Sequence, residues 1–119
     1  MKTLAPVIVS SILLSVAASS AFAGNCTLNV TRTACPGQEA ISFKKCNGEA
    51  SCEEFSETAT ADECKAAAVA SCENKRLTVT KSKVITATFD DAALKSASGN
   101  DDFCADYPNR AAEYDKCGG

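Results

Sequence analysis

The feature that most constrains this chain is a set of eight cysteines, all of which lie after residue 23. An even number of cysteines in a short exported chain is typical of a disulfide framework. Successive cysteines are separated by 8, 10, 5, 11, 7, 31 and 12 residues. We therefore predict four disulfide bonds among Cys26, Cys35, Cys46, Cys52, Cys64, Cys72, Cys104 and Cys117.

The same spacing argues against several other uses of cysteine. No two cysteines form a C-x-x-C pair, which is the arrangement of thioredoxin-like redox sites, zinc ribbons, c-type haem attachment and most iron–sulfur sites. The chain also has no histidine, the commonest zinc partner and general base. We therefore expect neither a metal nor a cofactor. The alternative is an all-cysteine metal site, which would need sulfurs that the bridges consume.

The apolar composition explains why such a chain needs crosslinks. From residue 24 onward, Leu, Ile, Val and Phe account for 13 of 96 residues. Chains with so small a share struggle to offset the conformational entropy lost on folding. Four bridges at roughly 2–4 kcal/mol each would rival the whole stability of a small domain.

The first 23 residues have the three-part layout of a secretory signal peptide. Lys2 precedes an apolar stretch at residues 7–16, and small residues follow, ending in Ala21-Phe22-Ala23. A membrane-spanning helix needs roughly 18 or more continuous apolar residues, and serines at positions 10, 11, 15, 19 and 20 interrupt this segment. We predict cleavage after Ala23, leaving residues 24–119 as a single cysteine-rich domain that is secreted or periplasmic and not membrane-bound.

Charge narrows the choice of partner. Residues 24–119 carry 11 basic and 15 acidic side chains, a net charge of −4, and the longest basic cluster is a dipeptide. Nucleic acids and anionic membranes bind concentrated positive patches. We therefore expect neither of them as a partner.

The residue pattern predicts an α+β fold that begins with a β-hairpin. Residues 27–34 and 40–46 alternate at the strand period, and residues 35–39 between them are turn formers. Asn47-Gly48 predicts a second turn. Residues 60–63, with the sequence TADE, form a capping box that predicts a central helix through about residue 73.

One or two further strands and a short helix complete the predicted fold. Residues 76–89 have strand character, and Lys81-Ser82-Lys83 is either a turn or the exposed middle of one long strand. Residues 90–106 are expected to form a loop. Pro108 fits the start of a C-terminal helix over residues 109–116.

The pairing of the cysteines is only partly constrained. Cys64 and Cys72 lie eight residues apart on the central helix, which separates them by roughly 12 Å. Bridged Cα atoms lie within roughly 7 Å, so these two cannot pair with each other. The pair Cys104–Cys117, which flanks the last helix, is the favoured bridge, although eight cysteines allow 105 connectivities.

Two acidic clusters are candidates for chemistry. Asn100, Asp101, Asp102 and Asp106 form an oxygen-rich loop, but their spacing departs from that of a calcium-binding EF-hand. Helix caps and solvated charges are therefore the favoured interpretation. The second cluster resembles the paired carboxylates of glycosidases, which need one buried, protonated member; its members are Glu53, Glu54 and Glu57.

Two short motifs match the N-glycosylation acceptor pattern, at Asn25-Cys26-Thr27 and Asn29-Val30-Thr31. The match is short and threonine is frequent here, so coincidence is the alternative.

The candidate partner surface lies near the C-terminus, where aromatic residues and an arginine cluster. Tyrosine and arginine are favoured interface anchors, and the alternative is that the aromatics pack the end of a core poor in large side chains. The residues are Phe103, Tyr107, Arg110 and Tyr114.

The sequence thus favours a non-catalytic exported binding module with an unknown protein or glycan partner and an undetermined oligomeric state. The alternatives are a small carboxylate-dependent hydrolase, using side chains such as Glu53, Glu54 or Asp101, and a ligand or metal carrier.

Overall fold

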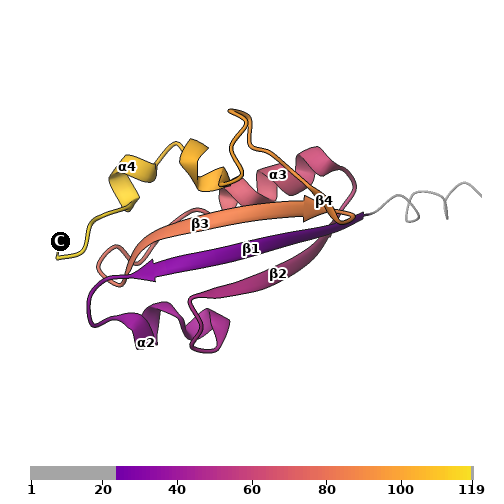
Figure 1. Cartoon of the computed structure of the whole chain (residues 1–119). Helices are drawn as coiled ribbons and strands as arrows, with labels where there is room; N and C mark the ends of the chain where they lie inside the picture. The colour runs from indigo at the N-terminus through magenta and orange to yellow at the C-terminus, as the bar shows by residue number, and fades with distance from the viewer. Residues whose placement is uncertain (1–23, 119) are drawn as a thin grey trace, which may run out of the picture.

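A four-stranded antiparallel sheet forms the frame of the protein (Figure 1). The computed structural model describes residues 24–118, so the predicted signal peptide lies outside the described residues. The strand order is β2-β1-β3-β4. The elements are β1 (Gly24–Ala34), α2 (Glu39–Ser42), the 3-10 helix η2 (Lys44–Cys46), β2 (Ser51–Thr58), α3 (Ala61–Ala70), β3 (Thr80–Phe89), β4 (Ala92–Ala93), the 3-10 helix η3 (Phe103–Asp106) and α4 (Arg110–Glu113). The predicted α+β class is confirmed.

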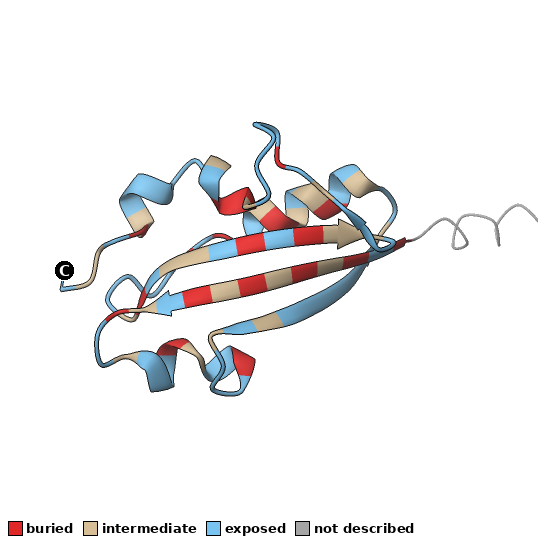
Figure 2. Cartoon of the chain, viewed as in Figure 1, coloured by how far each residue is buried: buried red, intermediate tan, exposed pale blue. Residues whose placement is uncertain are grey.

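The two faces of the sheet differ because side chains alternate along each strand. One face packs beneath α3 and carries the core, in which Leu28 and Val30 of β1 lie opposite Ala87 and Ile85 of β3. Buried and less buried residues alternate along β1 and β3 in Figure 2. Within residues 24–118, no helix covers the other face, which is rich in hydroxyl side chains, as at Thr86.

Helix α3 starts where the capping box predicts. The Thr60 side chain accepts a hydrogen bond from the Glu63 backbone N–H (3.1 Å), and the Glu63 carboxylate accepts one from the Ala59 N–H (2.8 Å). Each bond satisfies an amide that the first helical turn leaves unpaired. The helix ends at Ala70, three residues before the predicted end at residue 73.

The hairpin prediction was right about β1 and wrong about its partner. Residues 40–46 were expected to be a strand, but the structure places α2 and η2 in this region. Ile41 is 48% exposed, so its alternation with Phe43 does not mark a buried strand face. Left-handed Asn47 ends η2, as the turn signal predicted. The true antiparallel partner of β1 is β2, over residues 51–58.

Strand β3 begins at Thr80 instead of residue 76. Two turn hydrogen bonds, from the Val79 and Thr80 backbone N–H groups to the Arg76 carbonyl, occupy the preceding residues. Residues 81–83 continue the strand, so the alternative of one long strand is correct in this part. In the segment expected to be a loop, residues 90–106, the structure has β4 and η3.

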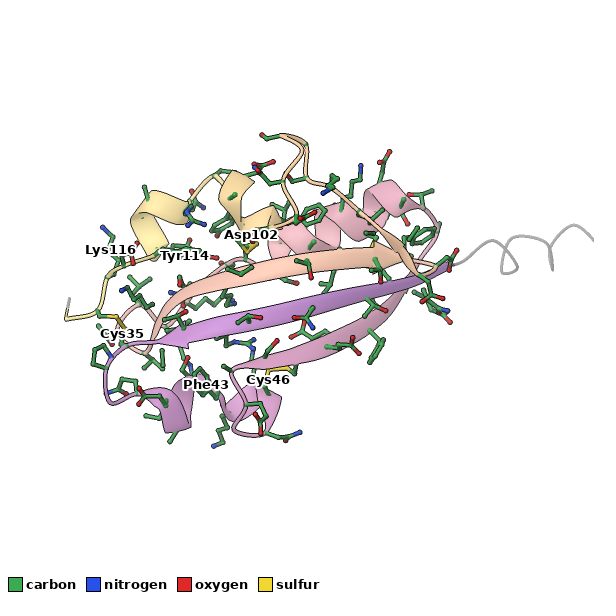
Figure 3. The ribbon with its side chains drawn as sticks, viewed as in Figure 1. Cys35, Phe43, Cys46, Asp102, Tyr114 and Lys116 are labelled. Carbon is green, nitrogen blue, oxygen red and sulfur yellow. A yellow bond between two sulfur atoms is a disulfide. The ribbon has the colours of Figure 1, made fainter. Side chains whose placement is uncertain are left out.

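All eight cysteines are paired, as predicted. Figure 3 labels Cys35 and Cys46, which belong to two of the bridges. Four bridges in so small a chain are typical of proteins that fold outside the cytoplasm. No helix among residues 24–118 is long and apolar enough to cross a membrane. The bridges are Cys26–Cys64, Cys35–Cys117, Cys46–Cys52 and Cys72–Cys104.

The pairing confirms one prediction and corrects another. Cys64 and Cys72 do not bond to each other; each ties an end of α3 to a different segment. The favoured Cys104–Cys117 bridge was wrong. Cys104 lies fully buried against Cys72, and the chain after α4 runs on to the far end of β1, where Cys117 meets Cys35. Helix α4 is also shorter than predicted, because Asp115, in left-handed conformation (φ 61°), follows it closely.

Candidate functional site

A basic pocket of about 480 Å³ is formed within residues 24–118. It lies on the helix-covered side of the sheet, between η2 and the C-terminal end of α3. Two acidic side chains, Glu54 and Glu73, also line it. The six cationic side chains around it are Arg32, Lys44, Lys45, Lys75, Arg76 and Lys83.

Two of these cations form the floor of the pocket. Arg32 of β1 and Lys83 of β3 lie directly opposite each other in the antiparallel register. They continue the row of side chains that begins with Leu28 and Val30, so the strands direct them toward the core side. Arg32 is only 7% exposed. Like charges placed directly opposite each other in a sheet are destabilising, so this pair calls for a physical reason.

The Arg32 guanidinium has donors to spare. Its Nη1 donates a hydrogen bond to the Cys46 Sγ (3.1 Å), and sulfur is a weak acceptor. Its Nη2 lies 3.9 Å from the Glu54 carboxylate, which is an ion pair but too long for a hydrogen bond. Among residues 24–118, every side-chain nitrogen or oxygen that is fully shielded from solvent has a hydrogen-bond partner. The Arg32 nitrogens that make no hydrogen bond are therefore accessible to solvent, and Arg32 lines the pocket.

The Lys83 ammonium group is directed to the other side of the pocket. Its Nζ donates hydrogen bonds to the backbone carbonyls of Ser71 (3.2 Å) and Glu73 (2.6 Å), just beyond the last turn of α3. Such carbonyls attract cations because they carry the negative end of the helix dipole. Burial, together with the nearby positive charges of Arg32 and Lys45, lowers the pKa of Lys83 to about 8.

Hydrogen bonds and a disulfide hold the walls of the pocket in place. The Ser42 hydroxyl of α2 and the Thr80 hydroxyl of β3 are hydrogen-bonded at 2.6 Å. The buried Asn74 side chain donates to the Thr80 carbonyl (2.7 Å), which fixes the turn between α3 and β3. The Cys46–Cys52 disulfide ties η2 to β2. The pocket is therefore built from tethered elements and needs no rearrangement to exist.

The electrostatics of the pocket oppose those of the chain. The chain carries a formal net charge of −3, whereas the pocket gathers six cations and two acidic residues. A concave site lined by one sign of charge concentrates ions of the opposite sign. Guanidinium groups bind carboxylate, phosphate and sulfate oxygens in a two-pronged geometry. The arrangement is suited to holding an oxyanion.

The predicted partner-surface residues do come together, but two of them lie in the core. Phe103 is 1% exposed and Tyr114 is 3% exposed. The Arg110 guanidinium stacks on Tyr114 at 5.2 Å from the ring centroid, and the Tyr107 ring lies 6.2 Å from the same ring. Tyr114, labelled in Figure 3, donates its hydroxyl to the Cys72 carbonyl (2.7 Å), and burial raises its pKa to about 12. Phe103 and Tyr114 thus pack at the edge of the core. That a partner binds at this cluster of four residues stays a prediction.

The glutamates proposed for hydrolysis do not converge as a group. On β2, residues 53 and 57 lie on the face without a helix, whereas Glu54 lies on the face with the pocket. Asp101 is elsewhere, in an ion pair with Lys95. Glu54 and Glu73, which share the pocket, are the carboxylates on which the hydrolase alternative now depends.

The oxygen-rich loop uses its carboxylates as caps. Asp102 accepts hydrogen bonds from the backbone N–H groups of Cys104 (2.9 Å) and Ile85 (3.0 Å). Asp106 accepts from the Ser98 N–H (3.0 Å), and hydrogen bonds from Ser96 and then Ser98 lower its pKa. Within residues 24–118, no group of three or more acidic or cysteine side chains is placed to hold a metal ion.

Sequence reasoning missed both floor residues of the pocket. The available signal was periodicity, since residue 32 continues the 26-28-30 row of β1 and residue 83 continues the 85-87-89 row of β3. A cation in such a row is an anomaly worth following.

No family model matches the chain, and no curated protein or solved structure shows significant similarity to it.

Proposed function

We propose that this protein is an exported, non-catalytic binding module whose pocket holds a ligand bearing an oxyanion group. Export is supported by the signal-like residues 1–23 and by the four disulfides, which suit an extracytoplasmic protein. The observation that carries the binding role is Arg32, a nearly buried guanidinium with free donors at the floor of a basic pocket.

Binding fits the pocket better than hydrolysis does. A carboxyl that acts as a general acid must be kept protonated by an apolar or buried setting. The Glu54 side chain is 45% exposed and paired with Arg32, and cations outnumber acids around Glu73. An oxyanion, in contrast, would relieve the repulsion between Arg32 and Lys83 and accept the hydrogen bonds that Arg32 does not make within the protein.

A titration of the oxidised protein with phosphate and citrate, followed by amide NMR, tests the proposal. We expect saturable shift changes centred on residues 32, 44–45, 73–76 and 83, because these residues line the pocket. The Arg32→Gln variant should bind about tenfold more weakly or worse, since a charge-assisted hydrogen bond contributes roughly 1.5–3 kcal/mol.

Two further variants make the result specific. Arg32→Lys keeps the charge and the fold but loses the planar fork, so it should bind with intermediate affinity. Lys65→Gln removes a cation outside the pocket and should bind as the natural chain does. Shifts spread evenly over the surface, or equal binding by Arg32→Gln and Lys65→Gln, would show that the pocket is not the site.

A further inference from the structure

Charge in the pocket is distributed over two opposite walls as well as the floor. Arg32 reaches toward η2 and β2, where it contacts Cys46 and Glu54. Lys83 reaches the other way, to the carbonyls that follow α3. The remaining cations of the pocket stand above these two sides. Lys44 and Lys45 belong to η2, and Lys75 and Arg76 follow α3.

The floor and the walls differ in exposure. Arg32 is buried and Lys83 is half-buried, whereas all four wall cations are exposed. One anionic group on the floor would contact only the first pair. The wall cations would then keep facing each other and the solvent, with only two acidic side chains to offset them. A ligand with several anionic groups along its length would engage all three positions.

The lining indicates which kind of polyanion fits. Among the described residues that line the pocket there is no aromatic side chain, and proteins that bind single-stranded nucleic acid stack bases on aromatic rings. Apart from the charged residues, the lining consists of the Asn74 amide, hydroxyls such as Ser42, and small or aliphatic side chains such as Ala70. Hydroxyl and C–H groups of a sugar can contact such a surface. The volume of about 480 Å³ lies within the range of small-ligand pockets.

We infer that the ligand is a linear acidic oligosaccharide that crosses the pocket from η2 to the segment after α3, with one anionic group on the Arg32–Lys83 floor. The inference rests on the proposed function and specifies its ligand. Uronate carboxylates and sulfate esters share the required oxyanion chemistry, and both occur on linear glycans. A glycan partner was also among the expectations from the sequence.

Calorimetric titration with ligands of increasing length tests the inference. The probes are galacturonic acid, its linear trimer and hexamer, a heparin-derived hexasaccharide, neutral maltohexaose and a six-residue oligothymidylate. We expect affinity to rise at least about tenfold from monomer to hexamer for one of the acidic glycans and to fall with added salt. The comparison of the two acidic hexasaccharides identifies the favoured oxyanion.

Variants of the walls separate length recognition from simple charge. Lys44→Gln/Lys45→Gln and Lys75→Gln/Arg76→Gln change exposed side chains, so both should fold. Each should weaken hexasaccharide binding about tenfold while changing phosphate binding less than about threefold. The matched control, Lys65→Gln/Lys116→Gln, removes the same charge outside the pocket and should have less than about a twofold effect.

The possible failures are distinct. If phosphate binds on the floor but affinity does not rise with glycan length, the oligosaccharide is ruled out and the oxyanion site stands. Tighter binding of oligothymidylate or of maltohexaose than of either acidic glycan also overturns the inference. If neither phosphate, citrate nor any acidic glycan binds, the proposed function itself falls.

Discussion

Arg32 and Lys83 occupy positions where the strand pattern favours apolar side chains, and this choice has a cost. Burying a cation requires compensation by hydrogen bonds or opposite charge. For Lys83 the α3 carbonyls supply it, but Arg32 obtains only a sulfur acceptor and a long ion pair. Under the proposed function, a bound oxyanion would supply the hydrogen bonds and opposite charge that Arg32 does not obtain within the protein.

The titration of Lys83 follows from its surroundings. Burial and the charges of Arg32 and Lys45 lower its pKa to about 8, against the smaller opposite effects of Glu54 and Glu73. We expect the Lys83 side-chain carbon-13 shift to titrate near pH 8, and oxyanion affinity to fall as the pH rises from about 7 to about 9. A bound anion should raise this pKa, because it favours the ammonium form.

The lowered pKa of Lys83 also makes the free energy of unfolding depend on pH. Between the folded pKa near 8 and the unfolded value of 10.5, the unfolded chain binds more protons at Lys83, so this residue makes unfolding less favourable as the pH rises through that window. The variant Lys83→Met should lack this component in urea unfolding curves. A Lys83 midpoint near 10.5 in the natural chain would show that its ammonium is not buried as described.

A helix start that depends on contacts between residues close in sequence was predicted correctly, whereas a strand that depends on pairing with a distant segment was missed. The Thr60–Glu63 capping box marked the start of α3 because both hydrogen bonds are made within four residues. Strand β2 was missed because it is an edge strand, exposed on both faces and acidic, so its residues show no apolar alternation. Its existence depends on pairing with β1, which no short window contains.

The same reason hid the pocket. Arg32 and Lys83 are 51 residues apart in the sequence, and only the β1–β3 register places them opposite each other. The pocket also needs η2, in a segment whose alternation at Ile41 and Phe43 suggested a strand. The cations of the pocket come from β1, η2, β3 and the turn after α3, so the site left no motif within any short stretch of sequence.

The disulfide beside the pocket, Cys46–Cys52, and the one that ties the C-terminal segment to the end of β1, Cys35–Cys117, should contribute differently to the free energy of unfolding. The Cys46–Cys52 bridge spans 6 residues, and Cys35–Cys117 spans 82. Since a crosslink restricts the unfolded chain more when its loop is longer, removing the first pair should cost about 2 kcal/mol and removing the second about 4–5 kcal/mol. Urea unfolding of the paired Cys→Ala variants measures both.

For oxyanion binding we expect the opposite order: loss of the short bridge should matter more than loss of the long one. The short bridge holds η2 beside Arg32, so its loss should weaken oxyanion binding, while loss of the long bridge leaves the pocket residues tethered. Equal stabilities of the two double variants would contradict the loop argument, and unaltered binding in the Cys46→Ala/Cys52→Ala protein would show that η2 is not a working wall.

For the whole molecule, sulfur takes the place of much of the usual apolar core. Four cysteines, Cys26, Cys64, Cys72 and Cys104, are fully buried, and their two bridges attach α3 to β1 and to η3. The large side chains around them are few, chiefly Ile85 and Phe103 among the fully buried ones. Covalent bonds near both ends of α3 therefore add to its apolar packing in holding the helix on the sheet.

Reduction of the purified protein should consequently unfold it. At roughly 2–4 kcal/mol per bridge, the four together match the 5–15 kcal/mol that separates folded from unfolded states in small proteins. In strong dithiothreitol we expect loss of near-ultraviolet circular dichroism and collapse of amide NMR dispersion, while the same protein in buffer with oxidised dithiothreitol keeps both. Intact mass should show eight added hydrogens on reduction, which confirms that all four bonds opened. If the fully reduced chain retained its native spectrum, apolar packing around Ile85 and Phe103 would have to be sufficient alone, and the link between the disulfides and an extracytoplasmic fold would lose its physical basis.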